Sequence, residues 1–571
     1  MAEKTGKYKI IEQLLADGIT HMFGNPGTSE EGFLDAVTSY PEFTYITTLQ
    51  ETIAVAIADG YARKRQKPAV VQLHSGVGLG NGVGMIYQAM RGHSPLVILA
   101  GESGIKYDSM DAQMAADLVA IAKPVVKWAA RVVDPNSVLR MLRRAIKMAQ
   151  TPPMGPVFLC LPMDVLDAPN IEDIVKTPVL YTAVSPDTKI LREVAQILSA
   201  SKNPMIIAGD GISESGAQHE LLRVAAEIGA EVWTTNSSTV NMPTSYKLYC
   251  GDLGHMFGSR SSAITSKADA VLICGTYLFP EVFPALYNVF KPGAKVIHID
   301  LNSYEIAKNF PVDIGIVADP KLTLNNLLSA LKEIRPTQEQ WQEIRDRMSA
   351  MDEHKAETLR QQKEADLKNR GRTPLYPSEF MEALSKKLPK DAIIFDEALT
   401  TSPDIIRYMP ADMPSRYFQT RGGSLGVGVP GAIGIKVASP DKTVIGFSGD
   451  GGSMYTIQAL WTAARYNIGA KFIITNNQSY RLLKDNIIQY WKEIGQSEHT
   501  FPESFCLKKP AIRFDELARA LSVDAVRVEK SDQIDGAIDK MLNTNGPFLI
   551  DLVIESNPAG WKEGCDKGEG R

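Results

Sequence analysis

The feature that most constrains the fold of this 571-residue chain is the alternation of short apolar runs with longer amphipathic segments. The runs are rich in Val, Ile, Leu and Phe, as buried β-strands are, and the longer segments are typical of surface helices. Strands that alternate with helices form parallel sheets covered by helices. The sequence therefore predicts an α/β protein of doubly wound parallel-sheet domains. The clearest apolar runs lie at residues 68–73, 95–101, 155–161, 203–209, 268–275, 294–300, 392–397, 442–449, 470–477 and 547–554.

Two weakly patterned stretches interrupt this rhythm. One covers residues 176–187, and the other, charged and rich in Gln, covers about 335–377, where we expect a linker with a surface helix. A chain of this length is too long for one hydrophobic core. We therefore expect three domains and a short tail. Their predicted boundaries are 1–175, 188–335, 375–555 and 556–571.

Composition excludes several classes of partner. The net charge of −5 gives no reason to expect nucleic acid or an anionic membrane. No apolar run approaches the roughly 20 residues that a membrane span needs. The charged N-terminus lacks the apolar core of a signal peptide, and the five cysteines lack metal-ligand or disulfide-framework spacing. We expect buried thiols and a cytoplasmic enzyme.

A faint internal repeat marks two glycine-rich turns. Residues 67–90 and 441–466 share the order of strand, polar glycine-rich turn and helix. The first turn carries His74 and the second carries Asp450. Chance similarity is the alternative, but the arrangement favours two similar domains with different chemistry in equivalent turns.

The second turn has the ligands of a metal–phosphate site. Glycines allow close approach of a phosphate, whereas the Asp450 carboxylate repels phosphate unless a cation lies between them. The next strand ends at Asn476-Asn477, and successive parallel strands end at one sheet edge, so Asp450 and Asn477 can converge. Their oxygens suit Mg²⁺ or Ca²⁺. The amides of Gly452 and Ser453 and the Tyr455 hydroxyl can hold phosphate oxygens. A plain turn is the alternative for the GDG sequence alone.

The complete pattern resembles the thiamine diphosphate (ThDP)-dependent enzymes. Gly449-Asp450-Gly451 followed by Asn476-Asn477 is similar to their metal–diphosphate motif. The resemblance implies that Asp450, Asn477 and the Ser479 carbonyl ligate the Mg²⁺ that binds the cofactor diphosphate. Arg481 departs from the small residue often found in this loop. The resemblance covers nearly the whole chain and is greatest for the benzoylformate decarboxylase branch, through FGNPGTSEEGFLDAV, LQETIAVAIADGYAR, LHSGVGLGN, GHSPLVILAG, KPVVKWAARV and ALWTAARYNI.

The resemblance also implies a cofactor-activating acid and a hydrophobic wedge. Glu51, in LQETIAVAIADGYAR, corresponds to the glutamate that contacts the aminopyrimidine of ThDP. Leu425, in RGGSLGVGVPG, occupies the place of the apolar residue that bends the cofactor. The Gly423 carbonyl oxygen can accept a hydrogen bond from the amino group of the cofactor. A Leu packed in a core is the alternative for Leu425. Together with the diphosphate segment, the implied cofactor-binding residues are Glu51, Thr400, Thr401, Gly423, Leu425, Gly449, Asp450, Gly451, Gly452, Ser453, Tyr455, Asn477 and Tyr480.

His74 and Thr28 are the implied groups that face the substrate. In the decarboxylase-like branch, a His in the LHS turn transfers protons near neutral pH. Thr28 matches the position of an active-site Ser that can orient a substrate carboxylate. That branch supplies a second His from a segment that aligns with residues 275–287, where this chain has Phe279, Glu281 and Phe283 but no His. Glu281 can replace it in proton transfer, and Phe279, Phe283 and Tyr277 suggest an apolar pocket. His255 and His298 are predicted to be structural.

We therefore expect a ThDP- and Mg²⁺-dependent enzyme that decarboxylates a 2-keto acid without oxidation, with carboligase activity as a side reaction. The alternatives are an acetolactate synthase-like carboligase, a 2-hydroxyacyl-CoA lyase and, least favoured, a non-catalytic regulatory homologue. The resemblance implies that the first domain binds the pyrimidine of ThDP, that the middle domain is Rossmann-like and that the third domain binds the diphosphate. It also implies a homodimer or homotetramer with the active site between subunits. The glycine turn at residues 208–217 permits FAD or ADP in the middle domain, but an empty, structural turn is favoured.

Overall fold

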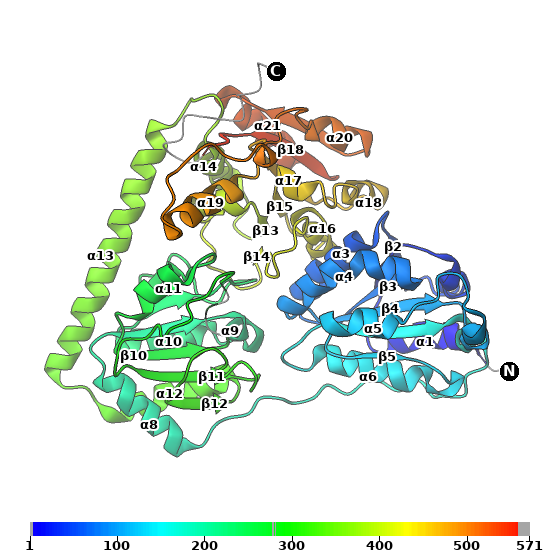
Figure 1. The fold of residues 1–571 in the computed structure, drawn as a ribbon, viewed down its shortest axis with the longest axis horizontal. Coiled ribbons are helices and arrows are strands. Elements are labelled where there is room, and N and C mark those ends of the chain that lie inside the picture. Colours follow the sequence, from blue (N-terminus) through cyan, green and yellow to red (C-terminus); the bar gives the residue numbers. More distant parts are fainter. Residues whose placement is uncertain (1–3, 277–278, 280, 558–571) are drawn as a thin grey trace. The chain divides into compact units, whose positions relative to one another are not determined.

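The computed structural model describes residues 4–276, 279 and 281–557. It contains three six-stranded sheets with flanking helices, which confirms the predicted α/β class (Figure 1). The chain forms two compact units: the first comprises residues 1–180, 371–402 and 420–571, and the second comprises 181–370 and 403–419. Among the helices of the described ranges, none is both long and apolar enough to cross a membrane. Cys160, Cys250 and Cys274 are free thiols as expected, but Cys506 is disulfide-bonded, a pairing that cysteine spacing did not reveal.

The first sheet of unit one has the strand order β2–β1–β3–β4–β6–β5, with parallel pairing throughout. Apolar residues of α1 and α6 pack on one face of this sheet, and α3 lies against β3 (Figure 1). The strands are β1 (His21–Gly24), β2 (Thr44–Thr47), β3 (Ala69–His74), β4 (Leu96–Glu102), β5 (Ala129–Arg131) and β6 (Val157–Pro162). The helices are α1 (Gly6–Ala16), α2 (Glu31–Val37), α3 (Glu51–Arg65), α4 (Ser75–Arg91), α5 (Leu118–Ala122), α6 (Val138–Gln150) and α7 (Met163–Asp167).

Five strands of another six-stranded sheet belong to unit one, in the order β13–β15–β16–β18–β17, and they pair in parallel. These strands are β13 (Ile393–Glu397), β15 (Val444–Gly449), β16 (Lys471–Asn476), β17 (Asp524–Val528) and β18 (Phe548–Val553). The associated helices are α14 (Pro377–Lys387), α16 (Gly428–Ala438), α17 (Asp450–Ser453), α18 (Ala459–Arg465), α19 (Arg481–Glu493), α20 (Phe514–Ala520) and α21 (Ile534–Asn543). The short strand β14 is Tyr417–Gln419 and helix α15 is Ser402–Tyr408.

Helices α3 and α16 pack directly against each other, and most residues of both are buried. Glycines permit this contact: a Cβ on Gly434 would lie 1.9 Å from the Ile57 carbonyl oxygen, and one on Gly60 would lie 2.2 Å from that of Gly431. Gly60, the later of the two α3 residues, thus contacts Gly431, and the earlier residue Ile57 contacts Gly434. The two helices run antiparallel, which fixes how the two sheets of this unit present their edges.

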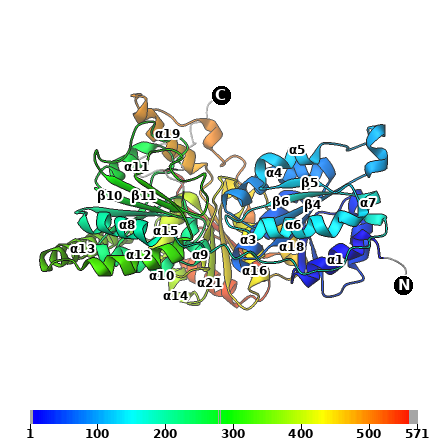
Figure 2. The same ribbon diagram turned by 90° about the horizontal axis from the view of Figure 1, so that it is seen from below.

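The sheet of unit two has the order β12–β11–β10–β7–β8–β9 and is also parallel. Alternate residues of β10 face opposite cores, because Leu272 packs with α8, α10 and α12, whereas Ile273 packs with Phe279 and Phe310. Figure 2 again shows α8 and α12 together. The strands are β7 (Pro204–Ala208), β8 (Glu231–Thr234), β9 (Tyr249–Asp252), β10 (Ala270–Cys274), β11 (Lys295–Asp300) and β12 (Ile314–Val317). The helices are α8 (Thr188–Ala200), α9 (Asp210–Ser215), α10 (Gln218–Ile228), α11 (Gly258–Thr265), α12 (Pro320–Ile334) and α13 (Gln338–Lys368).

The 31-residue helix α13 lies in the charged stretch where a surface helix is expected. It is attached to its unit by cations that cap backbone carbonyls. Arg347 donates to the Ile228 carbonyl oxygen at 2.8 Å, and the Lys355 ammonium donates to the carbonyl oxygens of Thr244, Tyr246 and Tyr249 at 2.6–2.9 Å. A mostly solvated helix is thereby held on the domain surface with few apolar contacts.

Candidate active site

Glu51 lies at the carboxyl-terminal edge of the first sheet. It is the first residue of α3, which follows β2, and only 6% of it is exposed. Its two carboxyl oxygens accept from the side-chain amides of Asn25 at 2.9 Å and Asn81 at 3.0 Å. Asn25 follows β1 and Asn81 belongs to α4. Three segments of the chain therefore fix the position of one buried carboxyl group.

His74 ends β3 at the same edge. A Cβ built on Gly78 would lie 3.2 Å from Glu51 Oε1 and 3.3 Å from His74 Cβ, so both residues flank one turn of α4. The chain also approaches the imidazole from the side of β1, since a Cβ on Gly27 would lie 2.1 Å from His74 Nδ1. Glycine at position 27 is therefore required for this loop to cover the ring.

Ser29 and Glu30 hold the imidazole of His74, a pairing that the sequence analysis missed. Nδ1 lies 2.9 Å from Glu30 Oε2 and 3.2 Å from Ser29 Oγ. Burial raises the pKa of Glu30, while hydrogen bonds from Ser29 and His74 oppose that rise. We assign the proton of neutral His74 to Nδ1, because a carboxylate accepts. Nε2 is then the nitrogen that can accept a proton. Thr28, predicted to face substrate, is exposed in the same short turn.

Asp450, Asn477 and Ser479 come together at the edge of the other sheet. Asp450 follows β15 and is 4% exposed, and Asn477 follows β16. Asp450 Oδ2 lies 3.3 Å and Asn477 Oδ1 lies 2.9 Å from the Ser479 backbone nitrogen, which donates to both. Burial raises the pKa of Asp450 to about 6 despite hydrogen bonds from backbone amides. The arrangement places a carboxylate oxygen, an amide oxygen and the Ser479 peptide at one point.

The two asparagines of the NN pair have different environments. The Asn476 side chain donates to Asp551 Oδ1 at 2.9 Å, and Asp551, which is fully buried, also accepts from Arg527. Asn476 thus links β16 to β18 within the sheet, because successive side chains of a strand point to opposite faces. Only Asn477 faces the Asp450 turn.

The residues around the Asp450 turn form a glycine-lined cradle. Tyr480 covers Gly451 so closely that a Cβ there would lie 2.4 Å from the ring. The Ser453 hydroxyl donates to the Gly449 carbonyl oxygen at 2.6 Å, so it holds the turn itself. A Cβ on Gly449 would meet no atom within 4 Å, and Tyr455 is 57% exposed. Thr401 is buried and Thr400 is partly buried in the short turn that follows β13.

Leu425 belongs to a loop that is fastened on two sides. Gln88 Oε1 accepts from the Gly422 backbone at 2.5 Å, and the Ser424 hydroxyl donates to the Gly84 carbonyl oxygen at 2.8 Å, so α4 holds its beginning. Gly423 has a φ of +79° and meets no atom within 4 Å of an added Cβ. The end of the loop is bound by Glu397, a residue that the sequence analysis did not identify.

Glu51 and the Leu425 loop lie toward opposite ends of the α3–α16 contact. Since α3 and α16 are antiparallel, Gly60 contacts Gly431, and Leu425 lies beyond the start of α16. Glu51 is nine residues before Gly60, or about 13 Å along the helix axis. Along α4 the contact points of the two groups are also apart, because Gly78 lies beside Glu51, whereas Gly84, six residues or about 9 Å further along, accepts from Ser424.

Comparison with known proteins identifies the chain. Models of thiamine pyrophosphate enzymes match it in three parts: the N-terminal TPP binding domain over residues 4–121, the central domain over 191–327 and the C-terminal TPP binding domain over 400–552. Benzoylformate decarboxylase of Pseudomonas aeruginosa is 31% identical over 559 residues, covering 97% of this chain and 99% of the relative. The chain belongs to the thiamine pyrophosphate enzyme family.

Other similar proteins include both decarboxylases and synthases. A probable acetolactate synthase large subunit of Methanocaldococcus jannaschii is 30% identical over 571 residues, covering 96% of this chain and 92% of the relative. The solved structure of a ThDP-dependent 4-hydroxybenzoylformate decarboxylase of Rhodococcus jostii RHA1 has a TM-score of 0.81 at 25% identity, covering 96% of this chain and 99% of that chain. This thiamine pyrophosphate enzyme is thus a lyase or carboligase that uses ThDP, another name for the same cofactor.

The residues of this thiamine pyrophosphate enzyme fit the cofactor and a hard cation. The Asp450 and Asn477 oxygens and the neighbouring peptide are all oxygen ligands, the type that Mg²⁺ and Ca²⁺ prefer. The described residues contain no cluster of three or more His, Cys, Asp and Glu side chains able to hold a metal, so a cation here relies on amide and carbonyl oxygens. The open face at Gly449 and the half-open Tyr455 leave room beside that donor set.

The middle domain corrects one expectation about substrate contacts. Phe279 is 3% exposed and packs with Phe290 and Phe310 in the core, so it is not a pocket wall; its position beside an apolar sheet face decides this. Phe283 is 53% exposed and stacks on Phe257. Tyr277 lies outside the described residues. Glu281 is buried, accepts from the Ser261 hydroxyl, and has its pKa raised by burial.

Two further features of the middle domain have structural explanations. His298 is buried and its Nε2 donates to the Thr276 carbonyl oxygen at 2.9 Å, as expected of a structural histidine. In the glycine turn, a Cβ on Gly211 would lie 2.6 Å from Gly275 Cα, so the close packing of two loops requires the glycine. The Asp210 carboxylate accepts from the Ser238 backbone and the Asn241 amide.

Proposed function

We propose that this enzyme decarboxylates a 2-keto acid without oxidation and releases the corresponding aldehyde and CO₂. The observation that carries the proposal is the position of His74. Glu30 and Ser29 fix its Nδ1, and the first turn of α4, at Gly78, lies against both His74 and Glu51. A decarboxylase must return a proton to the carbon that loses CO₂, and an imidazole with a free Nε2 suits that step near neutral pH. The similarity to benzoylformate decarboxylase supports this reading.

Each predicted residue has a defined task in this proposal. When bound, ThDP supplies a nucleophilic carbon and accepts the electron pair released as CO₂ leaves. Glu51 holds the pyrimidine through its carboxyl group, and Leu425 packs against the cofactor rings. Asp450, Asn477 and the Ser479 carbonyl hold Mg²⁺, or Ca²⁺, and the amides of Gly452 and Ser453 contact the diphosphate. Tyr455, Tyr480, Gly423, Gly449, Gly451, Thr400 and Thr401 complete the cofactor site, and Thr28 orients the substrate carboxylate.

We infer that the complete active site forms between two copies of the chain. The antiparallel α3–α16 contact keeps Glu51 away from the Leu425 loop within one copy. A second copy can supply the missing half, as in a homodimer or homotetramer. We further propose that the enzyme is cytoplasmic and that its domains extend over residues 1–175, 188–335 and 375–555. The glycine turn of the middle domain needs no FAD or ADP, since packing accounts for Gly211.

The second candidate function is carboligation. The acetolactate synthase relatives at 30% and 28% identity favour it, because the same reactive carbon can attack a second carbonyl compound before it is protonated. The decision between the two outcomes depends on how quickly His74 delivers its proton. A 2-hydroxyacyl-CoA lyase is the remaining alternative, in which an aldehyde forms from a thioester without CO₂.

A product assay tests the proposal. The protein, supplied with ThDP and Mg²⁺, is incubated with 2-keto acids that have aromatic, branched or short side chains and with 2-hydroxyacyl-CoA thioesters. CO₂ and aldehyde are measured separately. Equal amounts of CO₂ and aldehyde support the decarboxylase, and CO₂ without aldehyde indicates a carboligase. Aldehyde from a thioester without CO₂ contradicts both.

A further inference from the structure

Glu397 is a buried carboxyl group beneath the candidate cofactor site. It ends β13 and is 1% exposed. Its Oε1 accepts from the Gly426 backbone at 2.5 Å, and its Oε2 accepts from the Gly428 backbone at 2.6 Å and from the Ser448 hydroxyl at 3.1 Å. The Val427 backbone also donates to it. Four donors from two segments therefore converge on one carboxyl group.

These donors come from the parts that are expected to hold ThDP. Gly426–Gly428 directly follow Leu425, and Ser448 lies two residues before Asp450. A Cβ on Gly452 would lie 3.5 Å from Glu397 Oε1. Glu397 is therefore in contact with the wedge loop and with the strand exit, and it lies beneath the diphosphate turn.

The donor set is fully paired only by an ionised carboxyl group, and because burial raises the pKa of Glu397 to about 7, that form predominates above neutral pH. Successive backbone amides that point inward form a concave anion site, and here the chain fills that site with its own side chain. A carboxylate offers two oxygens and no hydrogen, so it can accept from all four donors. A glutamine would turn an NH₂ group toward a backbone N–H, leaving buried donors unpaired.

We propose that Glu397 is a positioning residue that holds the Leu425 loop in its cofactor-binding conformation before ThDP arrives. Gly423 and Gly426 both have positive φ values, +79° and +85°, a backbone conformation that favours glycine. Gln88 and the Ser424–Gly84 bond hold the beginning of the loop. Glu397 holds the amides at its end, where the Thr456 hydroxyl also donates to the Gly426 carbonyl oxygen at 2.7 Å. A preformed loop reduces the entropy lost when the cofactor binds. This inference rests on the proposed cofactor site.

Asp396, the residue before Glu397, holds a different segment of the candidate site. Asp396 points to the other side of the strand, where its carboxylate accepts from the Ala398 backbone at 2.8 Å and the Ser402 hydroxyl at 2.9 Å. It thereby fixes the turn that contains Thr400 and Thr401. Two adjacent acidic residues at one strand end thus fasten different segments of the site.

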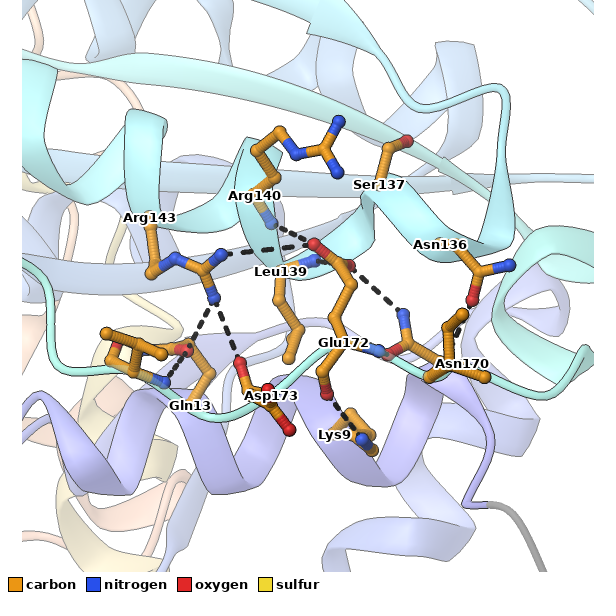
Figure 3. Close-up of polar contacts among 12 residues, drawn as sticks. Lys9, Gln13, Asn136, Ser137, Leu139, Arg140, Arg143, Asn170, Glu172 and Asp173 are labelled. Atoms are coloured by element: carbon orange, nitrogen blue, oxygen red, sulfur yellow. Dashed lines mark hydrogen bonds and ion pairs between the residues drawn. The ribbon is translucent and has the colours of Figure 1, made fainter.

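The chain provides a matched control in Glu172. Its Oε2 accepts from the Leu139 backbone at 2.7 Å and its Oε1 accepts from the Arg140 backbone at 2.9 Å, with the Asn170 amide as a further donor (Figure 3). Its side chain is 8% exposed. Glu172 therefore binds backbone amides through both carboxyl oxygens as Glu397 does, with two amides in place of three, but at the start of α6.

The first test uses the full-length protein without cofactor. Hydrogen exchange of the peptide that contains residues 420–428 is compared among the wild type, Glu397→Gln, Glu397→Asp and Glu172→Gln. We expect at least tenfold faster exchange at Gly426 and Gly428 in Glu397→Gln, partial protection in Glu397→Asp and wild-type protection in Glu172→Gln. Wild-type protection in Glu397→Gln would overturn the proposal, whatever the enzyme's substrate proves to be.

The second test measures ThDP affinity by titration calorimetry in the presence of Mg²⁺. We expect Glu397→Gln to raise the Kd of ThDP at least tenfold, Glu397→Asp to raise it less, and Glu172→Gln to leave it within twofold. At saturating ThDP, kcat of Glu397→Gln should approach the wild-type value, whereas its KM for ThDP should stay above that of the wild type. If Glu397→Gln does not fold, Ser448→Ala removes one donor and should raise the Kd two- to fivefold. Unchanged affinity in the folded variant contradicts the proposal, and no ThDP binding by the wild type contradicts the proposed cofactor site instead.

Discussion

The turns at His74 and Asp450 have the same local structure and different chemistry. Each follows an inner strand of a parallel sheet, β3 or β15, and each leads directly into a helix, α4 or α17. His74 is fixed by Ser29 and Glu30, which follow β1, the neighbour of β3 in the sheet. Asp450 is fixed by Ser479, which follows the next strand. The fold thus provides the position at the sheet edge, and the residue in the turn determines what that position does.

This difference also separates the tasks of the two edges. The His74 edge contains ionisable groups that can exchange protons, Glu51 and Glu30 among them. The Asp450 edge contains oxygen ligands and glycine amides that suit a cation and a diphosphate. Cofactor binding and proton transfer should therefore respond to different substitutions.

The largest effect should come from Glu51→Gln. The amide keeps the shape of the side chain but cannot act as an acid toward the pyrimidine, so kcat should fall on the order of 10³-fold. ThDP binding, measured by calorimetry, should change little, because the Asp450 edge is intact. Glu31→Gln, at the exposed start of α2, is the control and should leave kcat unchanged. Loss of ThDP binding in Glu51→Gln would contradict the division between the edges.

The next effect should come from His74→Ala. Without the imidazole, proton delivery slows, and kcat for aldehyde formation should fall about 10²-fold. The share of carboligation product should rise, as measured by chromatography of the products with an added aldehyde. His255→Ala, in the middle domain, should leave the product ratio unchanged. An unchanged ratio in His74→Ala would remove its proposed role.

A smaller effect is expected from Glu30→Gln. The glutamine can still contact Nδ1 but no longer provides a negative charge, so kcat should fall about tenfold. The pH–rate profile should also move, because the charge beside the imidazole affects its protonation. A wild-type profile with a reduced rate would mean that Glu30 acts only in folding.

The smallest effect concerns stability and pH. Burial raises the pKa of Glu397 from 4.5 to about 7. The folded protein therefore retains this proton to a higher pH than the unfolded chain does, and the contribution to stability is present below pH 4.5 and is lost as the pH rises through 7. The loss amounts to about 3 kcal/mol. Urea unfolding of the cofactor-free protein between pH 5 and 8 should show this decline in the wild type and a flatter dependence in Glu397→Gln.

The sequence allowed prediction of the architecture because its strands and helices alternate with clear periods. Glu51, Asp450 and Asn477 could be proposed as site residues because each lies in a local motif at a strand end. Glu30 and Glu397 could not, since their partners lie 44 residues away at His74 and about 30 residues away at Gly426. The prediction that Phe279 lines an apolar pocket was wrong, because aromatic residues suit a core and a pocket wall equally well. Only the packing of Phe279 against Phe310 distinguishes the two.

The central claim is that one active site needs the Glu51 edge of one copy and the Asp450 edge of another. The direct measurement is the activity of a hybrid made by co-expressing Glu51→Gln and Asp450→Asn chains with different affinity tags and purifying on both tags. Each variant alone should be inactive. A hybrid dimer contains one site with both defects and one intact site, so it should recover about half of the wild-type activity. An inactive hybrid that binds both tags would contradict the claim and place each complete site within a single chain.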